Sequence, residues 1–217
     1  MLIINWLNSV TGDESLWEKW FPKVYDSLMG PLERRGFGQI RKKLIQKAHG
    51  EVLEIGSGTG LNFPFYEHAN KVTAIEPEPR MRELSLPRAQ SAQVPIDVIL
   101  AEAEKLPFPD DFFDTVVCTL VFCTIPNPTK ALEEIRRVCK PEGHILLIEH
   151  VKIEHRFLGQ LQEWLTPFWK RLCDGCHLNR NTLHLVKLAG FKVTSVNRYY
   201  KDIFLVVEAI NKKQSFF

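Results

Sequence analysis

Glu51-Val52-Leu53-Glu54-Ile55-Gly56-Ser57-Gly58-Thr59-Gly60 is the stretch of this chain that decides its fold. Its short apolar run predicts a buried parallel strand, which ends in three glycines on alternate positions. Glycine permits a sharp turn out of a sheet and lets a ligand approach bare backbone. A helix expected over residues 61–68 would present amide N–H groups at its start, where a polar or anionic group of a nucleotide-like ligand binds.

Glu76 supports the same type of ligand. It ends a second predicted strand, residues 72–75, and follows the last glycine by 16 residues. A carboxylate at such a strand end can accept two hydrogen bonds from the hydroxyls of a ribose. The glycine spacing is G-x-G-x-G, whereas dinucleotide enzymes usually show G-x-G-x-x-G. A nicotinamide dinucleotide and an ordinary structural turn both remain alternatives at this point.

Composition limits the functional classes. A chain of 217 residues is long enough for one α/β domain, and a net charge of +2 gives no argument for a nucleic-acid partner. No run approaches the roughly 20 apolar residues that a spanning helix needs. The first residues lack the pattern of a signal peptide, and the five cysteines are an odd number. Reduced thiols in the cytoplasm are therefore expected.

The remaining sequence predicts alternating helices and strands. Prolines 77 and 79 are typical of a helix start, and Gly190 is typical of a helix end. An amphipathic helix is expected over residues 129–139. The predicted strands after residue 76 are 96–100, 115–118, 145–149, 191–199 and 204–209, the last two forming an antiparallel hairpin, and further helices are expected at 158–172 and 178–189.

Several motifs resemble those of class I S-adenosylmethionine-dependent methyltransferases. Ala101-Glu102-Ala103-Glu104-Lys105-Leu106-Pro107-Phe108 resembles the family signature G-D-A-E-x-L-P-F, and residues 137–143, R-V-C-K-P-E-G, resemble R-V-L-K-P-G-G. These motifs follow the glycine turn in the order and at the spacing of the family. The resemblance implies a Rossmann-like seven-stranded sheet of order 3-2-1-4-5-7-6. Its last-inserted strand would be antiparallel, and helices would cover both faces.

The resemblance also implies a cofactor, S-adenosylmethionine, with S-adenosylhomocysteine as the product. By this resemblance Tyr25 would close over the cofactor and Glu102 would accept from the adenine amino group. Met81, in the helix that begins near Pro77 and Pro79, is expected to pack beside the adenine. The full set of residues expected to bind the cofactor is Tyr25, Glu54, Gly56, Ser57, Gly58, Thr59, Gly60, Asn62, Glu76, Pro77, Met81, Glu102, Ala103, Thr119 and Leu120.

The expected domain organisation has two parts. Residues 1–48 are predicted to form an aromatic-rich helical arm that packs over the domain edge or acts as a lid. Residues 49–210 form the methyltransferase domain, in which 150–190 supply helices on the substrate side. A basic stretch in the arm is expected to be a solvated face, with contact to a membrane surface as the alternative; it comprises Arg34, Arg35, Arg41, Lys42, Lys43 and Lys47.

Three further stretches narrow the resemblance to alkyl-thiol methyltransferases. They are residues 117–123, residues 149–151 and the segment from Trp164 to Arg180. The resemblance implies methyl transfer to a small, apolar acceptor, with thiol sulfur favoured. Methylation of carbon, nitrogen or oxygen in a quinone-like or phospholipid acceptor is the alternative. Two more remote alternatives are a nicotinamide dehydrogenase and a cofactor-binding protein without turnover. The sequence does not indicate an oligomeric state.

A thiol acceptor reacts as the thiolate, so a base would assist at neutral pH. His150, at the end of the fifth predicted strand, is the candidate base, and Asp174 would orient it or replace it. The alternative for His150 is a hydrogen-bonded structural histidine, and the alternative for Asp174 is a helix cap. Cys173-Asp174-Gly175-Cys176-His177 also matches a haem-attachment pattern and half a zinc site. Because no further ligands stand out, packing cysteines and no metal are expected.

Overall fold

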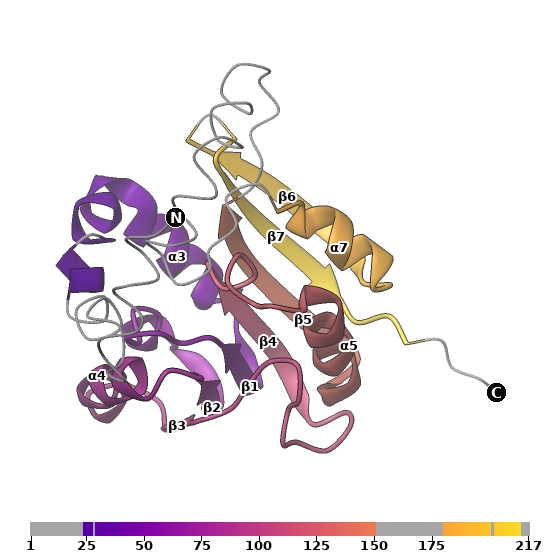
Figure 1. Cartoon of the computed structure of the whole chain (residues 1–217), viewed down its shortest axis with the longest axis horizontal. Helices are drawn as coiled ribbons and strands as arrows, with labels where there is room; N and C mark the ends of the chain where they lie inside the picture. Colours follow the sequence, from indigo (N-terminus) through magenta and orange to yellow (C-terminus); the bar gives the residue numbers. More distant parts are fainter. Residues whose placement is uncertain (1–23, 28, 151–179, 201, 214–217) are drawn as a thin grey trace, which may run out of the picture.

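The computed structural model describes residues 24–27, 29–150, 180–200 and 202–213, which form a sheet with helices on both sides (Figure 1). In chain order its elements are η1 (Glu33–Phe37), α3 (Gly38–Ile45), β1 (His49–Ile55), η2 (Phe63–Phe65), β2 (His68–Ile75), α4 (Pro79–Gln90), β3 (Ile96–Ile99), β4 (Phe113–Thr119), α5 (Pro128–Val138), β5 (Cys139–His150), α7 (Thr182–Leu188), β6 (Lys192–Tyr199) and β7 (Phe204–Ile210).

The sheet has seven strands in the order β3-β2-β1-β4-β5-β7-β6. The pairs among β1 to β5 are parallel, whereas β7 runs antiparallel to both β5 and β6. The expected fold, with its antiparallel last-inserted strand, is therefore confirmed. The sequence order reverses between β1 and β4, which makes the carboxyl edge of these two strands the topological switch point.

Each central strand contributes to two cores because successive side chains point to opposite faces. Ile145 and Leu147 of β5 pack in the core beneath α5 and α7. Leu146 and Ile148 belong to the core that also contains Phe37, Leu44 and Ile45 of η1 and α3. In Figure 1, α3 and α4 accordingly lie on one side of the sheet and α5 and α7 on the other. Residues 37–45 thus pack directly on the sheet, and the expected boundary at residue 48 stays a prediction.

The prediction of a helix over residues 61–68 is wrong. The chain forms only a single 3-10 turn there, η2, in which the amide of Phe65 donates to the carbonyl of Asn62 over 2.9 Å. Pro64 lacks an amide hydrogen, and β2 begins at His68, so little chain remains for an α-helix. The glycine turn is therefore followed by tight turns rather than by a helix start.

Some expectations fall outside the described residues. These are the helix over 158–172, Asp174, and the Cys173–His177 pattern. Within the described segments, no helix combines the length and apolar character that crossing a lipid bilayer requires. Across those same segments, histidine, cysteine and acidic side chains nowhere gather in a group of three that could hold a metal ion.

Candidate active site

The strand register brings the predicted binding residues to one edge of the sheet. Ile55 pairs with Ile75 on one side and with Cys118 on the other. Ile75 pairs in turn with Ile99, and Thr119 with Ile148. The residues that follow these strand ends therefore converge, although they are far apart in sequence. They include the turn 56–60, Glu76, the segment 100–103, Thr119 with Leu120, and His150.

The three glycines of the turn have positive φ angles of 63°, 54° and 80° at residues 56, 58 and 60. A Cβ at Gly56 would lie 2.2 Å from Cγ2 of Val121, and one at Gly60 would lie 2.6 Å from the Phe63 ring. A Cβ at Gly58 would meet no heavy atom of the described chain within 4 Å. Two glycines thus permit close packing, whereas Gly58 borders open space where a ligand can lie against the backbone.

Glu76 holds this turn from the end of β2. Its Oε2 accepts from the amide of Gly58 over 2.7 Å, and its Oε1 accepts from the amide of Glu78 over 3.0 Å. The residue is only 7% exposed. Each oxygen of a carboxylate can accept more than one hydrogen bond, so Glu76 has the chemistry to accept from hydroxyl donors as well. Within the described residues, the buried Oγ of Ser57 makes no hydrogen bond. Such a polar atom beside the open Gly58 fits a polar ligand.

Glu54 and Asn62 lie in a buried polar network. Glu54 accepts from Nδ2 of Asn62 over 2.9 Å and from the hydroxyl of Tyr66 over 2.6 Å. The same Asn62 amide lies 3.0 Å from Oγ1 of Thr119. Burial raises the pKa of Glu54 from 4.5 to about 7, against the two hydrogen bonds and the charge of Arg41, which lower it. Burial likewise raises the pKa of Tyr66 well above its usual value, with Glu54 adding to the rise.

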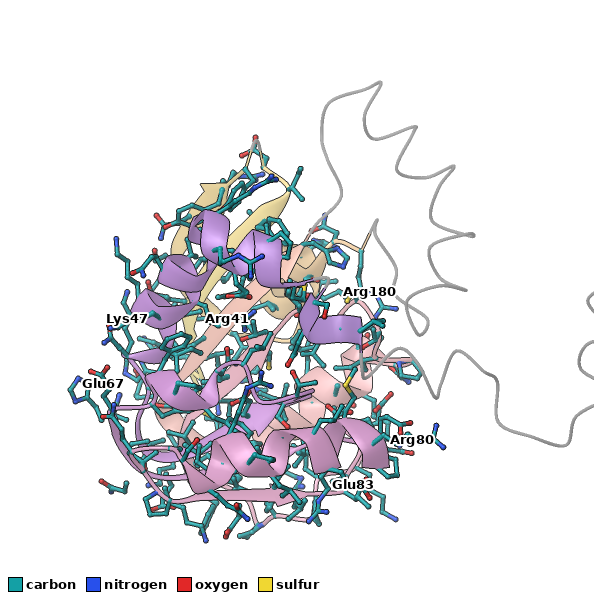
Figure 2. All side chains as sticks on the ribbon, turned by 90° about the vertical axis from the view of Figure 1, so that its left-hand side faces the viewer. Arg41, Lys47, Glu67, Arg80, Glu83 and Arg180 are labelled. Atoms are coloured by element: carbon teal, nitrogen blue, oxygen red, sulfur yellow. The ribbon has the colours of Figure 1, made fainter. Side chains whose placement is uncertain are left out.

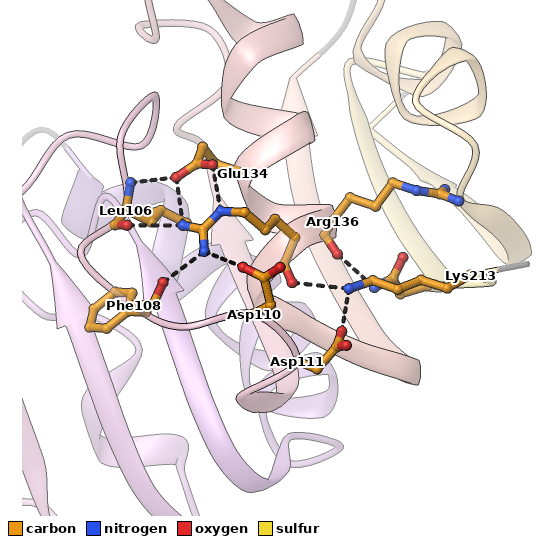
Figure 3. Close-up of polar contacts among 9 residues, drawn as sticks. Leu106, Phe108, Asp110, Asp111, Glu134, Arg136 and Lys213 are labelled. Carbon is orange, nitrogen blue, oxygen red and sulfur yellow. Dashed lines mark hydrogen bonds and ion pairs between the residues drawn. The ribbon is translucent and has the colours of Figure 1, made fainter. Parts of the chain in front are cut away.

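The segment after β3 carries the residues expected at the adenine. Glu102 is exposed and Ala103 is buried. The following segment is fixed from α5, where Arg137 donates to the carbonyls of Leu106 and Phe108 over 3.0 and 2.8 Å (Figure 3). Glu134 completes the clamp by accepting from the amide of Leu106 over 2.8 Å. Across the edge, Pro77 is exposed and Met81 is buried in the first turn of α4.

The segment containing Tyr25 is held against the glycine turn. Asp26 accepts from the hydroxyl of Thr59 over 2.6 Å and from Nη2 of Arg88 over 2.6 Å. Arg88 also donates to the carbonyl of Thr59 over 2.6 Å. Burial raises the pKa of the neighbouring Tyr25 to about 12, so its hydroxyl stays protonated at neutral pH. These contacts place the segment that carries Tyr25 beside the turn.

The loop after β4 forms the other side of the edge. Leu120 has a φ angle of 55°, and its amide donates to the carbonyl of Ile148 over 2.7 Å. Glu149 accepts from the amides of Val121 and Phe122, each over 2.9 Å. His150 ends β5, where it pairs with Phe204 of β7. The candidate base therefore follows directly after the carboxylate that shapes this loop.

Sequence reasoning missed several of these residues. Arg41 was grouped with the solvated basic residues, yet it is 3% exposed and contacts Asn62. A signal was present, because Phe37, Leu44 and Ile45 lie four, three and four positions from it, on one helix face. Tyr66, Arg88 and Glu149 also lacked an assigned role. Their contacts depend on the tertiary fold, for which short motifs give no signal.

Comparisons with known proteins agree with this arrangement. Residues 53–147 match the family model described as a methyltransferase domain. The chain is 37% identical over 167 residues to the thiol S-methyltransferase TMT1B of Rattus norvegicus, covering 75% of this chain and 68% of the relative. It is 32% identical over 185 residues to the human thiol S-methyltransferase TMT1A, covering 80% and 76%.

A solved structure supports the fold. The crystal structure of a SAM-dependent methyltransferase from Aquifex aeolicus superposes with a TM-score of 0.59 at 24% identity, covering 78% of this chain and 88% of that one. At this identity the likeness concerns the fold, and it agrees with the seven-stranded order described above.

Proposed function

Because this chain belongs to the family of S-adenosylmethionine-dependent methyltransferases that includes TMT1A and TMT1B, we propose that it methylates the thiol sulfur of a small, apolar acceptor. The observation that carries the choice of thiol is the identity of 32–37% to relatives named thiol S-methyltransferases. The aromatic character of the predicted substrate segment supports an apolar acceptor.

The residues at the sheet edge fit the cofactor. We propose that Gly58 and the buried Ser57 hydroxyl contact it, and that Glu76 accepts from its ribose. Glu102, Ala103 and Met81 would surround the adenine. Pro77 and Leu120 would complete the wall, with Tyr25 as a cover. When bound, the cofactor supplies an electrophilic methyl group on a sulfonium.

The proposed step is an in-line displacement. The acceptor sulfur forms a bond to the methyl carbon while the bond from that carbon to the sulfonium breaks, which leaves S-adenosylhomocysteine. The thiol proton goes to a base, for which we propose the imidazole of His150 at the end of β5. Asp174 would orient this base. Positioning of the two sulfur atoms supplies much of the rate in such a reaction.

The base role has a direct test. His150→Ala should lower the rate about 100-fold at pH 7, since general bases contribute at least this much, and less at pH 9, where a free thiol ionises unaided. Full activity of the variant across pH 6–9 would remove His150 from the mechanism. Loss of activity at every pH to the same extent would point to a structural role.

The identity of the acceptor is tested with three classes of substrate in parallel. The purified chain is incubated with S-adenosylmethionine and an alkyl thiol, a quinol, or vesicles of phosphatidylethanolamine, and products are measured by mass spectrometry. The proposal predicts a methyl thioether and S-adenosylhomocysteine in equal amounts with the thiol. Methylation of the quinol or lipid alone would overturn the choice of thiol. Cofactor binding without any methylated product would favour a non-catalytic role.

A cytoplasmic location is part of the proposal. So are an N-terminal helical arm within residues 1–48, which packs over the domain edge or acts as a lid, and the absence of a nucleic-acid partner. Among the described cysteines, Cys118 and Cys139 are buried free thiols, which supports a reducing compartment. Fractionation of cells that express the tagged chain would test this. Recovery with washed membranes would contradict it.

A further inference from the structure

Arg41 is the buried cation behind the glycine turn. It lies on α3 and is 3% exposed, and in Figure 2 it lies among interior side chains, whereas Lys47 and Glu67 lie at the outer edge. Its Nη2 donates to Glu33 over 2.7 Å and its Nη1 donates to Oδ1 of Asn62 over 2.6 Å. A buried charge without partners is costly, so both contacts are needed to hold it in place.

The contact with Arg41 fixes the orientation of the Asn62 amide. A guanidinium can only donate hydrogen bonds, so the oxygen of Asn62 must face it. The two hydrogens of Nδ2 then point to Glu54 and Thr119, at 2.9 and 3.0 Å. A flipped amide would direct its hydrogens at the donors of Arg41, which is repulsive, and would lose the hydrogen bonds that Nδ2 donates to Glu54 and Thr119.

Asn62 in turn joins the two strand ends at the topological switch point. Glu54 lies near the end of β1, and Thr119 ends the neighbouring β4. Because Thr119 Oγ1 accepts from Asn62, its own hydrogen is left to point to another acceptor. The arrangement therefore sets both the distance between the turn and β4 and the direction in which Thr119 can donate.

We propose that Arg41 is a positioning residue for the cofactor, which orients Asn62 and through it holds the glycine turn against the end of β4. This inference rests on the proposed function. It assigns a role to a residue of α3, in the basic stretch that the sequence suggested was solvated. Arg41 does not act on the acceptor in this account, so its loss should affect cofactor binding and leave acceptor binding unchanged.

The test compares Arg41→Met with Lys43→Met, an exposed residue of the same helix. Titration calorimetry with S-adenosylhomocysteine gives the dissociation constant, and steady-state kinetics give kcat and the two KM values. Removing a charged hydrogen-bond partner should weaken cofactor binding about tenfold. The KM for S-adenosylmethionine should rise by a similar factor while the KM for the thiol stays constant. Lys43→Met should behave as the wild type.

A double-mutant cycle tests whether Arg41 acts through Asn62. Cofactor binding by the double variant Arg41→Met, Asn62→Ala should be no weaker than that by Asn62→Ala alone. Independent, multiplying effects would overturn the proposal. A lower kcat with unchanged KM values would also overturn it, because a merely structural loss reduces the active fraction.

A second variant serves if Arg41→Met does not fold. Arg41→Lys keeps the charge but replaces the planar fork with a single ammonium, which cannot hold Glu33 and Asn62 in the same geometry. It should raise the dissociation constant several-fold with kcat unchanged, and wild-type affinity would contradict the proposal. A wild-type protein that fails to bind S-adenosylhomocysteine is a different result, since it removes the proposed function together with this inference.

Discussion

Gly56 and Gly58 share a left-handed backbone, yet a side chain at each would meet different surroundings. We predict that Gly58→Ala weakens binding of S-adenosylhomocysteine at least tenfold but lowers the free energy of unfolding by only about 1 kcal/mol, the cost of the positive φ. The added methyl group would extend into space that no described atom occupies. Calorimetric titration and urea denaturation measure the two effects.

Gly56→Ala is the matched control for this prediction. Its Cβ would lie 2.2 Å from Cγ2 of Val121, so we expect overpacking and strain to lower the free energy of unfolding by about 2–4 kcal/mol. If Gly58→Ala destabilised the fold as much as Gly56→Ala did, the space at Gly58 would not be a ligand site.

Glu54 makes the stability of the folded protein depend on pH. Its pKa of about 7 exceeds the ordinary value of 4.5, so the folded state holds a proton that the unfolded state releases in this range. Stability therefore falls as the pH rises from about 4.5 to 7. Glu54→Gln stays neutral, and we predict that its stability relative to the wild type increases between pH 5 and 8 by about 1–3 kcal/mol.

Urea denaturation of both proteins at pH 5, 6, 7 and 8 measures this difference. The hydrogen bond from Tyr66 lowers the pKa of Glu54. Tyr66→Phe should therefore raise this pKa, so that the loss of stability continues to a higher pH than in the wild type. A difference between Glu54→Gln and the wild type that stays constant with pH would contradict the account.

At the scale of elements, the clamp from α5 should control the segment that follows the proposed adenine contacts. Arg137→Met removes the two hydrogen bonds to the carbonyls of Leu106 and Phe108 and the ion pair with Glu134. We predict faster hydrogen exchange at the Leu106 amide and a loss of about 1–2 kcal/mol in the free energy of unfolding, because the site is only partly buried.

Glu133→Gln, on the exposed face of the same helix, is the control and should leave the exchange of Leu106 unchanged. Unaltered exchange in Arg137→Met would mean that the backbone between β3 and β4 holds its shape without α5. The comparison is made by mass spectrometry on peptides that contain residues 101–108.

The elements that sequence predicted best are those with local signals. Helix α5 has an Asn127 cap that accepts from the amide of Lys130, a proline in its first turn, and buried residues at helical spacing. The strands follow from apolar runs, although β2 and β5 extend beyond the expected bounds. The prediction of a helix over residues 61–68 was wrong because it took no account of Pro64 or of the short distance to β2.

At the scale of the whole molecule, strand order and cofactor were predictable because motifs with a known order occur at matching spacing. The polar contacts behind the glycine turn were not predictable from the sequence. Arg41 and Asn62 are 21 residues apart, and Asp26 and Arg88 are 62 apart. The charge of the stretch suggested that Arg41 is solvated. The apolar residues at helical spacing around it indicate the buried face, and the packing of α3 on the sheet shows which side chains it contacts.

The central claim is that the carboxyl edge around Gly58 and Glu76 binds the nucleoside of S-adenosylmethionine. Titration calorimetry of the purified chain with S-adenosylhomocysteine and, separately, with NADH tests it most directly. Glu76→Ala is titrated alongside Glu83→Ala, an exposed residue of α4. We predict binding of S-adenosylhomocysteine alone, weakened at least tenfold by Glu76→Ala and unchanged by Glu83→Ala. Binding of NADH alone, or equal affinity in the wild type and Glu76→Ala, would contradict the account.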